Sequence, residues 1–314
     1  MDNINDKILE KSKSLWGITD ELVFIRRVAN YIYYAPQSKV YFRLTESWHR
    51  NIEQVKSELD WMFYLQTRGI DFAHPIKSKS DEYCETVESG DEKYIVSVFK
   101  EARGKRIIEK EEFNDELLSN WGEIIGKMHS YTKDYKPSEV QRRSEWNAEE
   151  YHENILKLIR PEHGKIYEEF NRLDKLFSTF PKDNHSYGLI HADLHTGNFH
   201  VDENNQIMSF DFDDCVYGWF IYDIVVFLWA LESFNLNWER VQESILEGYN
   251  KHNRIDEFWF NHMPDFYNYR VILIHYYCMK ALSDRKLNET SREWMSSRVK
   301  KSRDYFNLEK PYPF

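Results

Sequence analysis

The chain has 314 residues, of which 41% are hydrophobic, so one large or two modest domains with a real core are expected. Its net charge of −11 argues against nucleic acid as a partner and is compatible with a cationic substrate, although solubility alone explains it. No window approaches about 18 uncharged apolar residues and the N-terminal stretch lacks a signal-peptide core, so no membrane span is expected. The scattered thiols of Cys84, Cys215 and Cys278 suit a reducing cytoplasm and argue against disulfides or a zinc site.

The first part of the chain is predicted to form a small sheet with helices. A loosely helical apolar rhythm predicts a helix over residues 3–15. Strands are expected at residues 22–27, 31–34 and 40–44, each bounded by turn residues. Residues 50–66 have the apolar spacing of an amphipathic helix. Strands and helix together predict one compact α+β region.

Further strands are expected in the rest of this first part. Residues 70–76 lead into a fourth strand, residues 80–90 form a polar hairpin region, and residues 94–99 form the last strand.

The second part is predicted to be mostly helical. Residues 217–220 (YGWF) are expected to be a turn, and residues 284–314 a charged tail that is either docked or frayed. Apolar spacing predicts helices within 114–131, 149–177, 222–231, 238–249 and 258–282.

One stretch carries a cluster of polar side chains between two short strands. An apolar strand at 187–191 ends at a polar turn, and a second strand at 206–212 follows a hairpin turn. We expect the hairpin to bring Asp193, Asn198 and Asp211 into one neighbourhood.

The spacing of these residues fits a phosphoryl-transfer template. His191-x-Asp193, four residues and then Asn198 match H-x-D-x-x-x-x-N, and Asp211-Phe212-Asp213 stands where Asp-Phe-Gly is expected. One carboxylate is needed to accept the proton of an attacking hydroxyl. An amide oxygen and a second carboxylate are needed to hold Mg²⁺ against the phosphates.

The segments HADLHTGN, FDFDD and YDI together resemble the aminoglycoside phosphotransferase and choline kinase superfamily, small-molecule relatives of protein kinases. The resemblance implies an α+β, bilobal protein-kinase-like fold, with a small antiparallel-sheet N-terminal lobe carrying one main helix and a larger, mostly helical C-terminal lobe. It also implies ATP (or GTP) and Mg²⁺ as cofactors, and a small-molecule hydroxyl acceptor.

The same resemblance implies roles for individual acidic residues. Asp193 is expected to be the catalytic base, and Asn198 and Asp211 the Mg²⁺ ligands. Asp213 or Asp214 is expected to contact a second metal or a cationic group of the substrate.

Two further implied features concern the loop around the base. Asp223, in the YDI segment, is expected to anchor this loop as a structural support. Ala192 replaces the glycine usual in the family, and its methyl group can be accommodated if the local φ is negative.

Nucleotide contacts are expected in the first domain. Residues 27–30 contain no glycine, but Asn30 stands at the place of an Asn that precedes the second strand in the family. Arg43 occupies the position of the phosphate-binding lysine, with Lys39 as the alternative. The helix partner of that cation is expected to be Glu58, with Glu53 as the alternative.

Residues 99–104 resemble the family's hinge, which ends in a glycine, and the resemblance implies that adenine binds there through the carbonyl of Lys100 and the amide of Ala102. It also places the domain boundary at this hinge, near residue 103, which gives domains of residues 1–102 and 103–314. Three functions compete: a small-molecule kinase, a protein serine/threonine kinase of the same superfamily, and a nucleotide-binding pseudokinase. Nothing in the sequence selects among aminoglycoside-, choline-, homoserine- or sugar-like acceptors, and the oligomeric state stays open.

Overall fold

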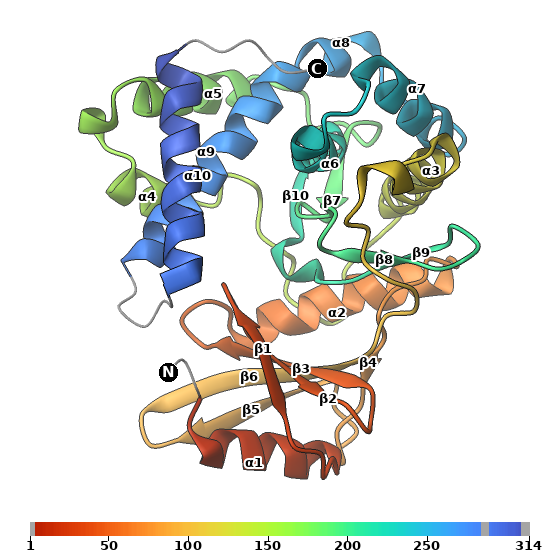
Figure 1. Cartoon of the computed structure of the whole chain (residues 1–314), viewed down its shortest axis with the longest axis vertical. Coiled ribbons are helices and arrows are strands. Elements are labelled where there is room, and N and C mark those ends of the chain that lie inside the picture. Colours follow the sequence, from red (N-terminus) through yellow and green to blue (C-terminus); the bar gives the residue numbers. More distant parts are fainter. Residues whose placement is uncertain (1–3, 284–288, 309–314) are drawn as a thin grey trace. The chain divides into compact units, whose positions relative to one another are not determined.

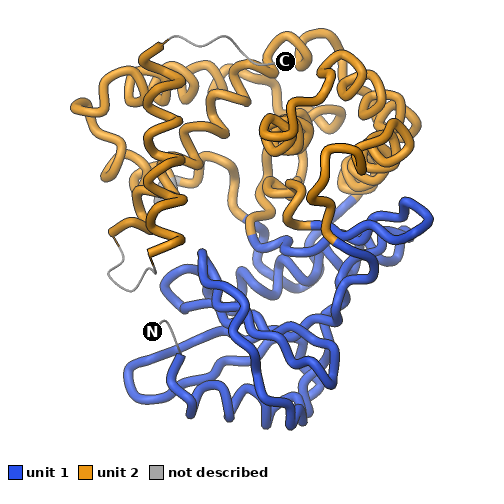
Figure 2. The backbone as a smooth tube through the Cα atoms, in the orientation of Figure 1, with its two compact units in different colours: residues 1–105, 135–143, 199–213 blue, residues 106–134, 144–198, 214–314 orange. Residues whose placement is uncertain are grey.

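The computed structural model describes residues 4–283 and 289–308. These residues form two compact units, each built from several stretches of chain (Figure 2). Unit 1 comprises residues 1–105, 135–143 and 199–213, and unit 2 comprises residues 106–134, 144–198 and 214–314. Two later segments of the chain, residues 135–143 and 199–213, belong to the first unit. The expected division between residues 102 and 103 stays a prediction.

Unit 1 is built on an antiparallel sheet (Figure 1). Its strands follow the order β1-β2-β3-β6-β4, and β5 also pairs with β6. The strands are β1 Val23–Arg27, β2 Tyr31–Ala35, β3 Val40–Glu46, β4 Pro75–Ile76, β5 Cys84–Ser89 and β6 Glu92–Lys100. A separate hairpin pairs β8 Phe199–Val201 with β9 Ile207–Ser209.

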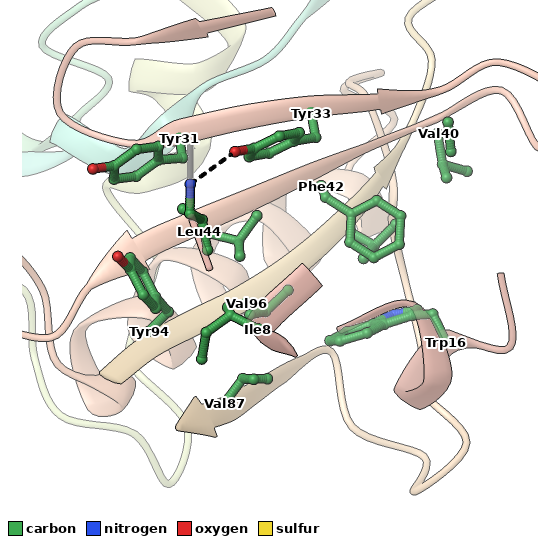
Figure 3. Close-up of a cluster of buried hydrophobic side chains, with 13 residues drawn as sticks. Ile8, Trp16, Tyr31, Tyr33, Val40, Phe42, Leu44, Val87, Tyr94 and Val96 are labelled. Atoms are coloured by element: carbon green, nitrogen blue, oxygen red, sulfur yellow. Dashed lines mark hydrogen bonds between the residues drawn. The ribbon is translucent and has the colours of Figure 1, made fainter. Parts of the chain in front are cut away.

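Successive side chains of β3 point to opposite faces of the sheet, and a different helix covers each face. Phe42 packs against Trp16 of α1 (Asp6–Trp16), within the buried cluster of Figure 3. Arg43, the next residue, bonds instead to α2 (Ile52–Thr67). The sheet therefore has an apolar core on the α1 side and a buried ion pair on the α2 side.

Strand β5 is one arm of the expected hairpin. Residues 80–90 were expected to form a polar hairpin region, and Cys84–Ser89 is a six-residue strand that pairs antiparallel with β6, the next strand in the chain. Only Cys84 and Val87 of this strand are buried, so its polar side chains obscured the alternation that marks a half-buried strand.

Unit 2 is mainly helical. No helix among the described residues is both long and apolar enough to cross a membrane. The α-helices are α3 Asp115–Thr132, α4 Glu149–Leu158, α5 Lys165–Ser178, α6 Ile221–Leu231, α7 Trp238–Tyr249, α8 Glu257–Asn261, α9 Met263–Leu282 and α10 Glu289–Asn307. The 3₁₀ turns of the chain are η1 Lys110–Glu112, η2 Pro161–His163, η3 Phe212–Asp214 and η4 Glu232–Phe234.

Helices α3 and α7 approach each other so closely that only glycine fits at the contact. A Cβ at Gly122 would lie 2.0 Å from the carbonyl oxygen of Ile245, and one at Gly248 would lie 1.8 Å from that of Ser119. Both obstacles are backbone atoms, which cannot move aside as a side chain can. The two glycines therefore set the distance between these helices.

The predicted turn at residues 217–220 is wrong. Val216–Trp219 is strand β10, which pairs residue by residue with β7 (Tyr187–Ile190) in a two-stranded antiparallel sheet. Gly218 suggested a turn, but in the ladder it lies opposite Gly188. A Cβ at Gly188 would meet the ring of Phe220 at 3.0 Å, so this glycine serves close packing.

The described part of the C-terminal segment is docked, which is one of the two alternatives expected for it. Glu289–Asn307 forms α10, whose Met295 and Val299 are buried against Cys278 of α9. The predicted helix over 258–282 is divided into α8 and α9, and Pro264 stands in the first turn of α9, where a proline is tolerated. The expected tail residues 311–314 lie outside the described residues.

Candidate active site

Asp223 anchors the loop that follows β7. It lies in the first turn of α6, is buried, and accepts hydrogen bonds from the amides of His191 (3.0 Å) and Ala192 (2.7 Å). His129 of α3 contacts the same carboxylate at 3.1 Å. Burial lowers the pKa of His129, and Asp223 opposes this only in part. These contacts agree with the structural role that the resemblance implies for Asp223.

Ala192 does not have the negative φ under which its methyl group was expected to be accommodated. Its φ is +64°, in the left-handed region that favours glycine. The two hydrogen-bonded amides at Asp223 hold the loop in this conformation despite its strain.

Asp193, the expected base, has both carboxylate oxygens engaged within unit 2. Arg270 of α9 donates to Oδ1 at 2.6 Å, and the Asn198 amide donates to Oδ2 at 3.0 Å. His195 Nε2 lies 3.5 Å from Oδ2. Burial raises the pKa of Asp193, but His195 and Arg270 outweigh it and hold the pKa below its usual value. The carboxylate is therefore ionised, as a base must be.

Asn198 presents an oxygen that fits a metal ligand. Its side chain is 1% exposed, and its Nδ2 is fixed by hydrogen bonds to the carbonyl oxygen and to Oδ2 of Asp193. Its Oδ1 is buried and has no hydrogen-bond partner among the described residues. A buried amide oxygen without a donor suits a hard divalent cation.

The three acidic residues after β9 have different surroundings. Asp211 has a φ of +65° and accepts a hydrogen bond from Arg26 of β1 at 2.9 Å. Asp213 is buried in unit 1, whereas Asp214 is half-buried and belongs to unit 2. The metal-binding role of Asp211 and the second-metal or substrate role of the other two stay predictions.

Asp213 is enclosed by polar groups of unit 1. Asn30 donates to its Oδ2 at 3.1 Å, His49 Nε2 lies 3.2 Å from the same oxygen, and Arg50 Nε lies 3.4 Å from Oδ1. Burial raises the pKa of Asp213, but Arg50 and His49 outweigh it and hold the pKa well below its usual value. The structure thus joins two of the predicted residues, Asn30 and Asp213. Thr45 extends this hydrogen-bond network by donating to Asn30 Oδ1 at 2.7 Å.

The predicted ion pair between β3 and α2 is present. Arg43 donates to the two oxygens of Glu58 at 2.8 and 2.7 Å, a bidentate arrangement with both side chains almost fully buried. The two alternative residues are not buried as this pair is. Lys39 is an exposed turn residue, and Glu53 is exposed on α2 with its carboxylate 3.6 Å from Lys56 Nζ. Contact of Arg43 with a nucleotide stays a prediction.

The hinge residues lie at the end of β6. Lys100 is exposed, and its amide donates to the carbonyl of His74 at 2.8 Å. Ala102 is buried in a small apolar cluster with Ala73 and Met208, against which Phe210 packs. This cluster was not predicted, because its members come from three separate stretches of sequence. The adenine contacts of Lys100 and Ala102 stay predictions.

Sequence reasoning missed Arg270. The only signal was that it is the one Asp, Glu, Lys or Arg between residues 266 and 279, a stretch made mostly of apolar and aromatic residues. Within unit 2 the structure joins Asp193, Asn198 and Arg270, and within unit 1 it joins Asn30 with Asp213 and Arg43 with Glu58. The expected convergence of Asp193 and Asn198 with Asp211 stays a prediction.

Comparison with known proteins identifies the family. Residues 31–258 match the model of the phosphotransferase enzyme family, which includes the aminoglycoside phosphotransferases. The chain belongs to this family, as its motifs indicated. It is therefore a phosphotransferase, an ATP-dependent kinase that acts on small-molecule hydroxyl groups.

Individual relatives agree with this assignment. Amicoumacin kinase of Bacillus subtilis (strain 168) is 28% identical over 309 residues, covering 93% of this chain and 90% of the relative. The solved amicoumacin kinase hAmiN, in complex with AMP-PNP, Ca²⁺ and Ami, has a TM-score of 0.84 and 26% identity, covering 99% of this chain and 96% of that one. A microcompartment-associated aminopropanol kinase shares the fold, with a TM-score of 0.74 at 18% identity over 97% of this chain and 98% of that one. The expected α+β protein-kinase-like fold is confirmed.

Proposed function

We propose that this enzyme transfers the γ-phosphoryl group of ATP to a hydroxyl of an antibiotic-like small molecule, with amicoumacin as the first candidate acceptor. The amicoumacin kinases are similar to this chain over nearly its whole length, which supports that choice. The finding that carries the chemistry is the pair of Asp193 and Asn198, in which an ionised carboxylate is bonded to an amide with an unpaired buried oxygen.

In the proposed reaction, Asp193 takes the proton of the acceptor hydroxyl as that oxygen bonds to the γ-phosphorus. The bond between the γ-phosphorus and the bridging oxygen breaks, and ADP leaves. Asn198 and Asp211 would hold Mg²⁺, which supplies charge neutralisation at the phosphates when it is bound. Arg43, oriented by Glu58, would contact the phosphates.

The remaining nucleotide contacts belong to the same proposal. The Lys100 carbonyl and the Ala102 amide would bind adenine, and Asn30 would support the phosphate loop through its bond to Asp213. A location in the cytoplasm and an acceptor with a cationic group complete the proposal, and the net charge of −11 is compatible with the latter.

An acceptor screen with two variants tests this function. The acceptors are amicoumacin, spectinomycin, aminopropanol, choline and homoserine, each with ATP and with GTP, and the readouts are ADP release and mass of the product. Asp193→Asn should lose at least about 100-fold in turnover with MgATP affinity unchanged, whereas Asp211→Asn should weaken MgATP binding itself. Full turnover by Asp193→Asn would show that the base is wrongly assigned, and phosphorylation of a protein substrate instead would overturn the small-molecule acceptor.

A further inference from the structure

Arg270 is a buried cation that donates a hydrogen bond to the proposed base, Asp193. It lies in the middle of α9, its side chain is 5% exposed, and its Nη2 is 2.6 Å from Asp193 Oδ1. Burying a guanidinium in a helical core is costly, and a single carboxylate offsets that cost only where the geometry is good. A purely structural site would be filled more simply by an apolar side chain, so this pair calls for a functional explanation.

The contacts divide the two oxygens of Asp193 between two partners. Arg270 holds Oδ1, whereas Oδ2 faces the Asn198 amide and the His195 ring. Contacts to both oxygens fix the rotation of the carboxylate about its last side-chain bond. The oxygen next to Asn198 is then the one available to a hydroxyl group, because the other is held by the guanidinium.

Arg270 is itself held in place by an indole. Its guanidinium lies 4.8 Å from the ring centre of Trp229 on α6, a distance that permits a cation–π interaction. Arg298 of α10 lies 5.4 Å from the same ring and stacks on Trp294 as well. Helix α6 also begins near Asp223, the anchor of the catalytic loop, so one helix supports both the loop and Arg270.

We propose that Arg270 is a positioning residue for phosphoryl transfer. By donating a hydrogen bond to Oδ1, it holds the Asp193 carboxylate in the side-chain rotation that presents Oδ2 to the acceptor hydroxyl. This inference rests on the proposed function, in which Asp193 is the base. The guanidinium matters beyond its charge, because this planar group lies over the Trp229 ring, whereas a lysine ammonium is a point charge on a flexible stem that this ring would not hold in the same way.

The central test is therefore Arg270→Lys, which keeps the positive charge. Misplacement of a catalytic group by about 1 Å can cost on the order of 100-fold in rate, so we expect kcat to fall by at least about 10-fold. The KM for ATP and the MgATP dissociation constant, measured by calorimetry, should change by less than about 2-fold, because Arg270 does not act through the nucleotide. Arg270→Ala should lose more, and added guanidinium chloride at low millimolar concentration should restore part of its turnover.

A matched control shares the indole but not the carboxylate. Arg298→Lys alters the other cation that stacks on Trp229 and should leave kcat within about 2-fold of the parent enzyme. Thermal unfolding of each variant separates a loss of folded protein from a misplaced Asp193 carboxylate. Turnover uses the best acceptor of the screen, or ATP hydrolysis if none reacts.

Two results would overturn the inference. One is a kcat for Arg270→Lys within about 2-fold of the parent. The other is a loss in Arg270→Lys that is matched by Arg298→Lys or is fully explained by unfolding. Asp193→Asn, assayed in parallel, separates a failure of the positioning role of Arg270 from a failure of Asp193 as the base. If it is inactive while Arg270→Lys is fully active, only the positioning role fails, and if it is fully active, the proposed base fails with it.

Discussion

Arg26 donates to Asp211 Oδ2 over 2.9 Å, so the carboxylate proposed to hold a metal already has a cationic partner in unit 1. Arg26 lies on β1, next to the loop that lacks the glycines of related kinases. A metal ion at Asp211 has to compete with this guanidinium. Partly exposed ion pairs contribute about 0.2–1 kcal/mol, so the competition is modest and measurable.

Removing that competitor should strengthen metal binding. Arg26→Ala is expected to raise Mn²⁺ affinity without nucleotide by up to about 5-fold, as measured by electron paramagnetic resonance. Arg27→Ala is the control, because it removes one positive charge from the same strand but its guanidinium pairs with Glu46 at 3.3 Å. Equal gains in both variants would point to the general field of the protein and contradict specific competition at Asp211.

Removing one partner of the buried pair of Arg43 and Glu58 should strongly destabilise unit 1. Glu58→Ala leaves a guanidinium without its counter-charge in the interior, and removing one partner of a buried pair costs about 3–5 kcal/mol. Urea unfolding followed by tryptophan fluorescence measures the loss. Glu53→Ala, on the exposed side of the same helix, should change stability by less than about 0.5 kcal/mol. Similar values for the two variants would contradict a buried ion pair.

Ala192 and Ala73 are both buried, but Ala192→Gly should destabilise the protein much less than Ala73→Gly. At Ala192 the left-handed backbone costs an L-residue about 1–2 kcal/mol, so Ala192→Gly gains this amount and offsets the lost methyl group. Ala73→Gly loses both the methyl group and backbone order, or roughly 1–2 kcal/mol. Chemical denaturation of both variants tests the difference, and an equal loss would mean that position 192 is not strained in solution.

His275 should make the protein less stable in mild acid. It is fully buried on α9, and burial lowers its pKa to about 4, with Arg303 of α10 and His163 of η2 acting in the same direction. The folded state therefore resists protonation that the unfolded chain accepts below about pH 6.5, so stability is full above that pH and falls toward pH 4. The loss from this one group is roughly 3 kcal/mol.

The measurement is the free energy of unfolding between pH 7 and pH 4. His275→Leu should flatten this part of the curve, whereas His185→Gln, at an exposed position, should leave its slope unchanged. A slope that survives in His275→Leu would assign the acid sensitivity to other groups.

Local patterns predicted the elements whose signal lies within their own sequence. Helices α2, α3 and α7 follow their apolar spacing closely, and the spacing of His191, Asp193 and Asn198 predicted a loop in which the structure joins Asp193 to Asn198. The YDI segment, taken together with HADLHTGN and FDFDD, likewise predicted Asp223 as the anchor of the loop, and its bond to the Ala192 amide agrees with this role.

The features that were missed depend on partners distant in sequence. Strand β10 exists because β7 pairs with it, and Gly218 alone is as typical of a turn as of a tight ladder. Helix α10 buries only a narrow face, so its many charged residues outweighed Met295 and Val299 in the pattern. A lone arginine in a mostly apolar helix indicates that a carboxylate lies nearby. The sequence around Arg270 does not indicate that this carboxylate belongs to Asp193, which is 77 residues away.

The glycine contact between α3 and α7 sets a rule for recombining this enzyme with its relatives. A methyl group at position 122 or 248 would collide with the backbone of the opposite helix, so the mildest of side-chain additions is among the most damaging there. A chimera that imports one of these helices from a homologue with bulkier residues at the contact must import the other as well, because each helix fits only the partner against which it packs.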